Sequence, residues 1–202
     1  MLIKIHPETP SERRVKQIVD ILNVGGVIIY PTDTVYALAC AMDQKAAFEK
    51  ICRIKKVTPA KAKFSMIFED LSQVAKYTAQ TTTPQYRLLK KHLPGPFTFI
   101  LGASSELPSH LKAVRKTIGI RIPHHNVSLA IVKALGKPLF TSSLRSDDEI
   151  LEYYNDPEEI HDEFGKLVDV VIDAGPGTFE PSTVVDLTKA EPEILREGKG
   201  VL

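Results

Sequence analysis

Short runs rich in β-branched and aromatic residues recur along the whole chain, and their irregular spacing constrains the fold more than any other feature. Turn-forming residues bound them, as is typical of buried strands. They cover residues 27–30, 64–68, 97–101, 117–122, 139–143, 168–173, 183–187 and 194–196. Regular βαβ winding would require strict alternation with helices, whereas the last runs follow each other through loops alone. The pattern predicts an α/β sandwich around one twisted, mixed sheet of about seven strands.

Helices are expected where apolar residues repeat every three or four positions. The first begins near Ser11 and ends at Gly25-Gly26, and its apolar face consists of Val15, Ile18, Val19 and Leu22. Further helices are expected over residues 46–54, 86–91 and 127–135, and within the acidic stretch 147–164, where Pro157 opens the helix.

Length and charge limit the number of domains and the kinds of partner. The chain has 202 residues, which predicts a single domain over residues 1–202 that buries about 70% of its unfolded surface. Its 26 basic residues nearly balance its 25 acidic ones, which argues against nucleic-acid binding through overall charge but leaves room for a local basic patch.

Cysteine usage and hydropathy exclude two further classes. Cys40 and Cys52 lie twelve residues apart with no second pair, so a cysteine zinc site is excluded and buried thiols are expected. No run approaches the roughly 20 apolar residues of a membrane span, and no signal peptide is recognisable. A cytoplasmic protein is expected. The motifs GxxxxGK[ST], GxGxxG, HExxH and GxSxG are absent, so any nucleotide binds by another route.

Two polar clusters precede the middle of the chain. Thr32 and Thr34 alternate on an extended segment, so both hydroxyls face one side and form either a strand cap or a wall for a small polar ligand. The basic run Arg53, Lys55, Lys56, Lys61 and Lys63 fits either a solvated helix end or an anion site for polyphosphate or RNA backbone.

Two more clusters follow. Arg121 ends a strand and is suited either to binding a carboxylate or phosphate or to a structural ion pair. The histidines after it, His124 and His125, do not readily share a face, so no metal site is expected. Ser182 enters one strand and Arg196 leaves another, so that both can reach the same sheet edge.

In this order the clusters resemble the YrdC-like family, over residues 10–200. The resemblance is carried by residues 31–38, 94–98, 120–124, 182–186 and 195–198. Residues 5–7, 51–54 and 117–119 are most similar to its YciO branch. It implies a three-layer YrdC/RibB-like sandwich with a twisted mixed sheet and a positively charged concave surface.

The resemblance also implies an activity. Family members of known activity are threonylcarbamoyl-AMP synthases, which join L-threonine, bicarbonate and ATP, the last with Mg²⁺ as substrate rather than as a resident cofactor. The product serves the threonylcarbamoyladenosine modification of tRNA. The fold is also associated with binding tRNA and double-stranded RNA.

Carried over residue by residue, the family's motifs assign roles. Thr32, Thr34 and Tyr36 match the threonine-binding strand, with Arg121 on the carboxylate and Ser182 beside it. The expected nucleotide contacts are Lys55, Ser143 and Arg196, with Lys56 and Lys63 as further phosphate contacts. Lys55 and Arg121 are the expected catalytic residues.

Two positions depart from the family pattern. Val57 stands where an arginine is expected and Arg145 where an asparagine is expected. Loss of one charged phosphate contact costs about 1.5–3 kcal/mol. Three hypotheses therefore stay open: a threonylcarbamoyl-AMP synthase, a non-catalytic RNA- or nucleotide-binding protein, and a related enzyme that uses another small carboxylate.

Overall fold

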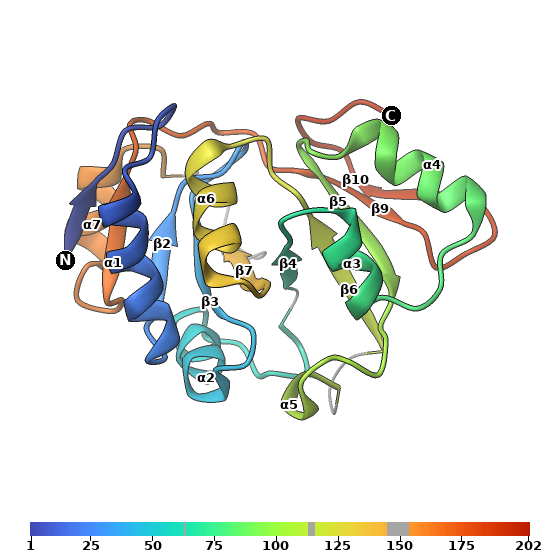
Figure 1. Cartoon of the computed structure of the whole chain (residues 1–202), viewed down its shortest axis with the longest axis horizontal. Helices are drawn as coiled ribbons and strands as arrows, with labels where there is room; N and C mark the ends of the chain where they lie inside the picture. Colours follow the sequence, from blue (N-terminus) through green and yellow to red (C-terminus); the bar gives the residue numbers. More distant parts are fainter. Residues whose placement is uncertain (63, 113–115, 145–153) are drawn as a thin grey trace.

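The computed structural model describes residues 1–62, 64–112, 116–144 and 154–202. In them, one mixed sheet runs through the molecule in the strand order β1-β8-β2-β3-β7-β4-β6-β5-β9-β10. Figure 1 shows helices packed along it. Parallel pairs join β8 to β1 and β2, β4 to β6, and β5 to β9, and the remaining neighbours are antiparallel. The mixed, twisted sheet expected from the sequence is confirmed.

The strands are β1 (Leu2–Lys4), β2 (Ile28–Tyr30), β3 (Ala37–Ala41), β4 (Ser65–Ile67), β5 (Phe97–Gly102), β6 (Thr117–Arg121), β7 (Leu139–Ser143), β8 (Val170–Asp173), β9 (Thr183–Asp186) and β10 (Glu193–Arg196). The helices are α1 (Glu12–Asn23), α2 (Lys45–Ile54), α3 (Leu71–Tyr77), α4 (Thr83–His92), α5 (Ser109–Lys112), α6 (Asn126–Leu135) and α7 (Pro157–Phe164). No described helix meets the length and apolarity that crossing a membrane requires.

The strand count corrects the sequence prediction: the sheet has ten strands, not about seven. The two strands that no run predicted are β1 and β3. β1 is only three residues long, and β3 consists mainly of alanine, which has low strand propensity. Of the acidic stretch 147–164, Pro157 opens α7 as predicted, and residues 147–153 lie outside the described part of the chain.

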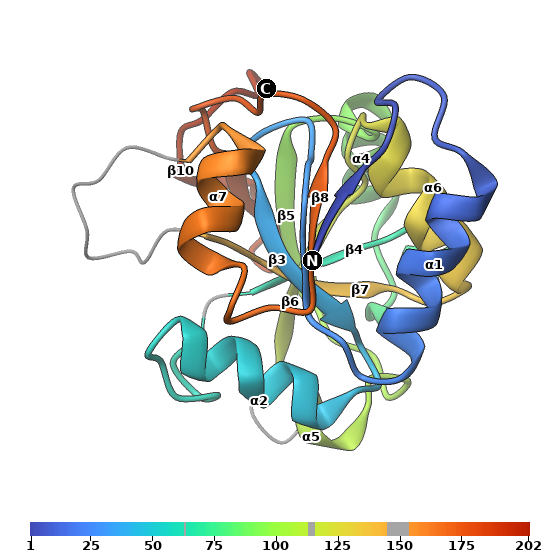
Figure 2. The ribbon, with the colours of Figure 1, turned by 90° about the vertical axis from the view of Figure 1, so that its left-hand side faces the viewer.

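Helices cover both faces of the sheet around β2, β3 and β8, which gives three layers (Figure 2). Ile28 and Ile172 pack in one apolar cluster with Ile18 of α1 and Ile131 of α6. Alternate residues of the same strands point the other way, into a second cluster that contains Val171, Phe48 and Ile51 of α2, and Ile160 of α7. Cys40 and Cys52 are buried in this second cluster, as predicted.

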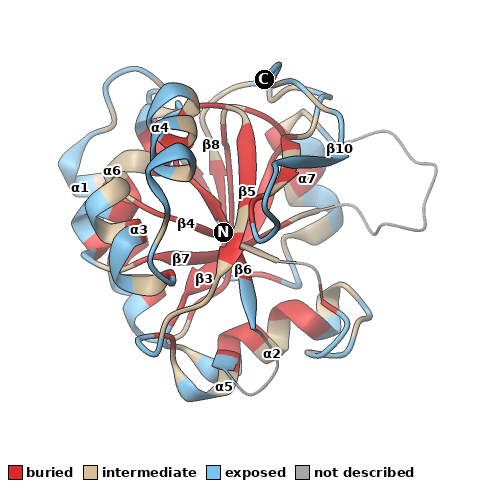
Figure 3. Cartoon of the chain, turned by 90° about the vertical axis from the view of Figure 1, so that its right-hand side faces the viewer, coloured by how far each residue is buried: buried red, intermediate tan, exposed pale blue. Residues whose placement is uncertain are grey.

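The sheet around β4, β6, β5 and β9 is built differently. Phe99 and Ile120 belong to the apolar cluster that also holds Val74 of α3 and Leu89 of α4. The neighbouring residues in each strand, Thr98 and Gly119, face the other side and line a cavity. Figure 3 shows the buried strands at the centre and exposed β10 at the edge. The face without α3 and α4 is therefore open to a ligand.

Candidate functional site

A cavity of about 450 Å³ occupies this open face. Its lining is rich in serine and threonine hydroxyls, contributed by β4, β5, β6 and β7, by the segment after β2 and by Ser182, just before β9. Arg121 and Arg196 also line it, and no aspartate or glutamate is among the described lining residues. Such a surface suits a polar ligand that carries negative charge.

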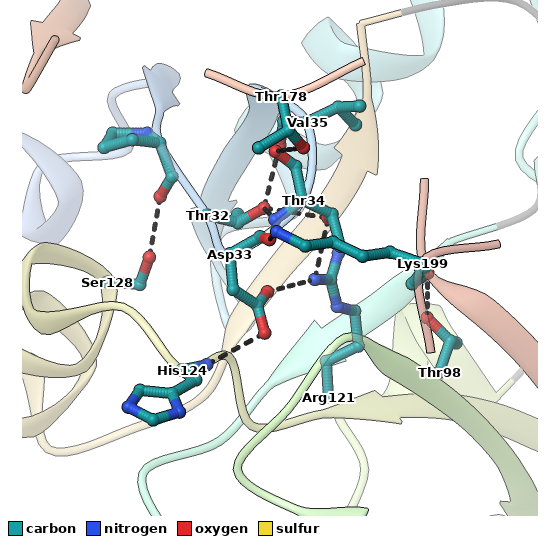
Figure 4. Close-up of polar contacts among 12 residues, drawn as sticks. Thr32, Asp33, Thr34, Val35, Thr98, Arg121, His124, Ser128, Thr178 and Lys199 are labelled. Atoms are coloured by element: carbon teal, nitrogen blue, oxygen red, sulfur yellow. Dashed lines mark hydrogen bonds and ion pairs between the residues drawn. The ribbon is translucent and has the colours of Figure 1, made fainter. Parts of the chain in front are cut away.

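The segment between β2 and β3 forms one end of the cavity (Figure 4). The Thr32 hydroxyl donates to the carbonyl of Val35 (2.8 Å) and accepts from the backbone N–H of Thr34 (3.1 Å). The two threonine hydroxyls lie 3.0 Å apart. Thr32 thus folds the segment from within, and of the two only Thr34 lines the cavity.

Arg121 lies next to Thr34 and is anchored by Asp33. Its Nη2 donates to Asp33 Oδ1 (2.8 Å) and to Thr34 Oγ1 (3.0 Å). The other carboxylate oxygen of Asp33 accepts the backbone N–H of His124 (2.9 Å). Both charged side chains are 7% exposed. Arg121 therefore makes the structural ion pair that was one of its two expected roles, and it lines the cavity as well.

Among the described residues, only the Nη2 of Arg121 has a hydrogen-bond partner. Its Nε is buried and has no hydrogen-bond partner among the described residues. A buried N–H without an acceptor costs about 1–3 kcal/mol, because it has lost its hydration. The guanidinium is thus held in place by Asp33 while part of its hydrogen-bonding capacity stays available to an acid group.

Tyr36 stands behind the wall rather than on it. Its hydroxyl donates to the carbonyl of Gly175 (2.7 Å) and accepts the N–H of Ala174 (3.4 Å). Burial raises the pKa of Tyr36 to about 12, so the phenol keeps its proton. Gly177 packs so closely that a Cβ there would lie 2.8 Å from the Tyr36 ring. Thr178 then donates through its hydroxyl to the carbonyl of Thr34 (2.6 Å).

Ser182 lies on the opposite wall. Its hydroxyl pairs with that of Thr98 (2.8 Å), which joins β9 to β5. Arg196 donates from Nη2 to the Ser182 carbonyl (2.8 Å) and more weakly to its hydroxyl (3.3 Å). Thr34, Arg121, Ser182 and Arg196 thus meet around one cavity.

The expected phosphate contacts are dispersed. Ser143 lines the cavity, whereas Lys55 is not among the lining residues and donates from Nζ to the Ser143 carbonyl (2.7 Å). Lys56 is exposed and is not among the lining residues. Lys63 and Arg145 lie outside the described residues. Val57 packs against the apolar core.

Sequence reasoning missed Asp33 and Thr178. The signal for Asp33 was present in the sequence. An acidic residue between two hydroxyl residues after a buried strand needs a cationic partner, and Arg121 was the candidate for it. Thr178 gave no signal, because its role depends on the backbone path after β8. Within the described residues no group of three potential metal-ligating side chains is found.

Comparison with known proteins agrees with this architecture. The sequence model of the Sua5–YciO–YrdC family, described as "Telomere recombination", matches residues 20–198. A Haemophilus influenzae protein is 46% identical over 97% of this chain and 94% of its own length. YciO of Escherichia coli is 42% identical over 97% and 94%, respectively.

Two solved structures extend the comparison. The crystal structure of E. coli YciO superposes with a TM-score of 0.92 at 40% identity, covering 100% of this chain and 97% of that one. P. abyssi Sua5 complexed with L-threonine shares the fold, with a TM-score of 0.88 at 22% identity over 98% of this chain and 57% of that one. The resemblance seen in the motifs is confirmed, and the chain belongs to the Sua5–YciO–YrdC family.

Proposed function

We propose that this protein is an ATP-dependent synthase that converts L-threonine and bicarbonate into threonylcarbamoyl-AMP. The observation that carries the proposal is the pairing of Arg121 with Thr34 at one end of the cavity. A cation with a spare buried donor beside a buried hydroxyl matches the carboxylate and hydroxyl of a small hydroxy amino acid. Membership of the Sua5–YciO–YrdC family supports this choice of reaction.

At the amino-acid end, the carboxylate of L-threonine would accept from Arg121. The hydroxyls of Thr34 and Ser182 would surround the rest of the molecule. Analogues without the threonine hydroxyl would leave a buried polar group unpaired, which gives discrimination at this end. The related P. abyssi Sua5 binds L-threonine on the same fold, which supports an amino-acid ligand.

At the other end, ATP would enter as its Mg²⁺ complex. Mg²⁺ usually binds through phosphate oxygens and water with few protein ligands. The threonine amine and bicarbonate would first form a carbamate with loss of water. An oxygen of this carbamate would then attack the α-phosphorus of ATP, and pyrophosphate would leave. The step needs positioning and charge neutralisation more than acid–base catalysis. Lys55, Ser143 and Arg196 are the residues proposed to supply it, with Lys56 and Lys63 assisting.

Pyrophosphate release, with each substrate omitted in turn, tests the proposal. Release that requires ATP, L-threonine and bicarbonate together is the expected result. Arg121→Lys keeps a charge opposite Asp33 but removes Nε, and we expect it to lower kcat/KM for L-threonine by about 100-fold. Arg87→Lys on exposed α4 is the matched control and leaves the rate unchanged. Undiminished release by the Arg121 variant would show that Arg121 does not hold the carboxylate.

A non-catalytic nucleotide- or RNA-binding role is the second candidate, and Val57 favours it. The side chain that replaces the family's arginine packs against the apolar core, so it offers no phosphate contact. In that case the folded protein releases no pyrophosphate, yet binds ATP, tRNA or double-stranded RNA. RNA binding through phosphates falls steeply with salt, so a titration between 50 and 200 mM salt identifies it.

A further inference from the structure

The C-terminal segment 198–200 returns along β9 and fixes the position of one lysine. The N–H of Gly198 donates to the Thr183 hydroxyl (3.1 Å), which itself donates to the carbonyl of Gly200 (2.6 Å). The N–H of Lys199 donates to the carbonyl of Pro181 (2.9 Å). Pro181 lines the cavity, so the Lys199 backbone runs along the cavity wall.

The two glycines that flank Lys199 allow this close approach. A Cβ at Gly198 would lie 2.3 Å from the Pro181 carbonyl oxygen, and one at Gly200 would lie 2.6 Å from the Phe97 ring. Cβ contacts below 3.0 Å are essentially absent from real structures, so a side chain at Gly198 would require backbone movement and one at Gly200 would require the Phe97 ring to shift. In the sequence Gly198-Lys199-Gly200 only the lysine can therefore extend away from β9.

The Lys199 side chain reaches the segment between β2 and β3. Its Nζ donates to the carbonyl of Asp33 (2.7 Å), on the segment between β2 and β3 (Figure 4). The next residue, Thr34, contacts Arg121. The side chain thus bridges Pro181, which lines the cavity, and Asp33, the neighbour of the lining residue Thr34, at the end where Arg121 lies; Lys199 itself is not among the lining residues.

The ammonium of Lys199 is not neutralised by a carboxylate there. Both carboxylate oxygens of Asp33 are already engaged, one by Arg121 and one by the N–H of His124. Within the described ranges, Lys199 forms no salt bridge, and its contact is with a neutral carbonyl. Lys199 is also exposed, so its hydrogen bond exchanges readily with one to a ligand.

We propose that Lys199 is a substrate-binding gate at the amino-acid end of the cavity. Its alkyl chain crosses beside the cavity from Pro181 to Asp33, and its ammonium joins Arg121 in binding the carboxylate of the amino acid. The chain must swing aside for the ligand to enter. The inference rests on the proposed function, because it takes L-threonine as the ligand.

Direct binding of L-threonine to the full chain, measured by calorimetry, tests the gate. Lys199→Met keeps the alkyl chain without the charge and should raise the Kd about fivefold. Lys199→Arg restores the charge and should recover most of the affinity. Lys199→Ala also removes the chain and should further accelerate dissociation in stopped flow. The exposed Lys166, between α7 and β8, gives the control Lys166→Met.

The outcomes separate this inference from the proposed function. Unchanged binding by Lys199→Met, with binding by the unaltered protein, overturns the gate alone. Equal weakening in the Met and Arg variants also overturns it, because the charge then makes no contribution. No binding of L-threonine by the unaltered protein overturns both the gate and the proposed amino-acid substrate. Thermal unfolding of each variant separates loss of binding from loss of folding.

Discussion

At the scale of single residues, Asp33 organises the site without lining it. Its carboxylate holds Arg121 and the backbone of His124, and its carbonyl accepts from Lys199. Two chain segments distant in sequence, one with Arg121 and His124 and one with Lys199, therefore converge on this residue. A buried charge that loses its partner costs far more than an exposed one, because it has no water to replace the lost contact.

We expect Asp33→Asn to lower the free energy of unfolding by about 3 kcal/mol, since it leaves the Arg121 guanidinium buried without a counter-charge. In the double variant, which combines Asp33→Asn with Arg121→Met, the loss of unfolding free energy should be smaller than the sum of the two single losses by at least about 1.5 kcal/mol. Urea denaturation of the four proteins measures this coupling. The exposed pair Lys16 and Asp20, whose Nζ and Oδ2 are 2.6 Å apart, is the control and should couple by less than about 0.5 kcal/mol. A comparable coupling for both pairs would contradict the role of burial.

The sequence identified the walls of the site but not their supports. Thr34, Arg121, Ser182, Ser143 and Arg196 were all expected, and all five line the cavity. Thr32 was expected on the same wall because of its spacing from Thr34, and Tyr36 because of the family resemblance. The structure uses them instead for hydrogen bonds behind it, since the segment between β2 and β3 turns rather than continuing extended. Residue type predicts what a side chain can bind, whereas the turn decides which way it faces.

At the scale of elements, β3 shows why alanine can form a central strand. Ala37, Ala39 and Ala41 belong to the apolar cluster that contains α1 and α6, and all three are buried. Their small side chains leave room for both helices against the sheet. Packing between elements thus overrides the low strand propensity of alanine.

Filling that space should be costly. We expect Ala39→Leu to reduce the free energy of unfolding by about 1–3 kcal/mol, because the added carbons have no space between β3 and the helices. Ala60 is exposed, so Ala60→Leu is the control and should change stability by less than about 0.5 kcal/mol. Guanidinium denaturation of both variants gives the comparison. Equal stability of Ala39→Leu and the parent would mean that the helices are not packed tightly on β3.

Local sequence signals account for most of the predicted strands and helices. They also account for the start of α4, which was predicted at the wrong residue. Each predicted β-branched run contains a strand. Burial on both faces leaves a strong composition signal in the central strands, whereas β10 is exposed along its length. Helix α4 begins at Thr83, three residues before the prediction. Thr82 and Gln85 form a capping box there, a pattern readable in the sequence. Strand order was beyond reach, because it depends on contacts between distant segments.

At the scale of the whole molecule, the two apolar clusters bury ionisable groups and thereby determine how the stability of the fold changes at high pH. Burial raises the pKa of Tyr30 and of Tyr36 to about 12, and burial raises that of the Cys40 thiol. Each group is neutral when protonated, so a raised pKa means that the unfolded chain gives up its protons first. The stabilisation is complete below the unfolded values, about 8.5 for cysteine and 10 for tyrosine, and is lost as pH rises above them.

The contribution of Tyr30 to this pH dependence can be measured separately. It is fully buried, and its hydroxyl lies 3.0 Å from that of Thr141. At pH 7 we expect Tyr30→Phe to be less stable by about 1 kcal/mol, because a buried hydrogen bond is lost. The variant has no phenol to ionise, so by pH 11 the difference should change by about 1.4 kcal/mol in its favour and the deficit should reverse, given an unfolded pKa of 10.0 and a folded one of about 12. Urea denaturation of both proteins from pH 7 to 11 measures the difference, in which the titration of all other groups cancels. The exposed Tyr86 provides Tyr86→Phe as the control, with no dependence on pH expected. A deficit for Tyr30→Phe that stays constant across this range would show that the phenol ionises as readily in the folded protein as in the unfolded chain.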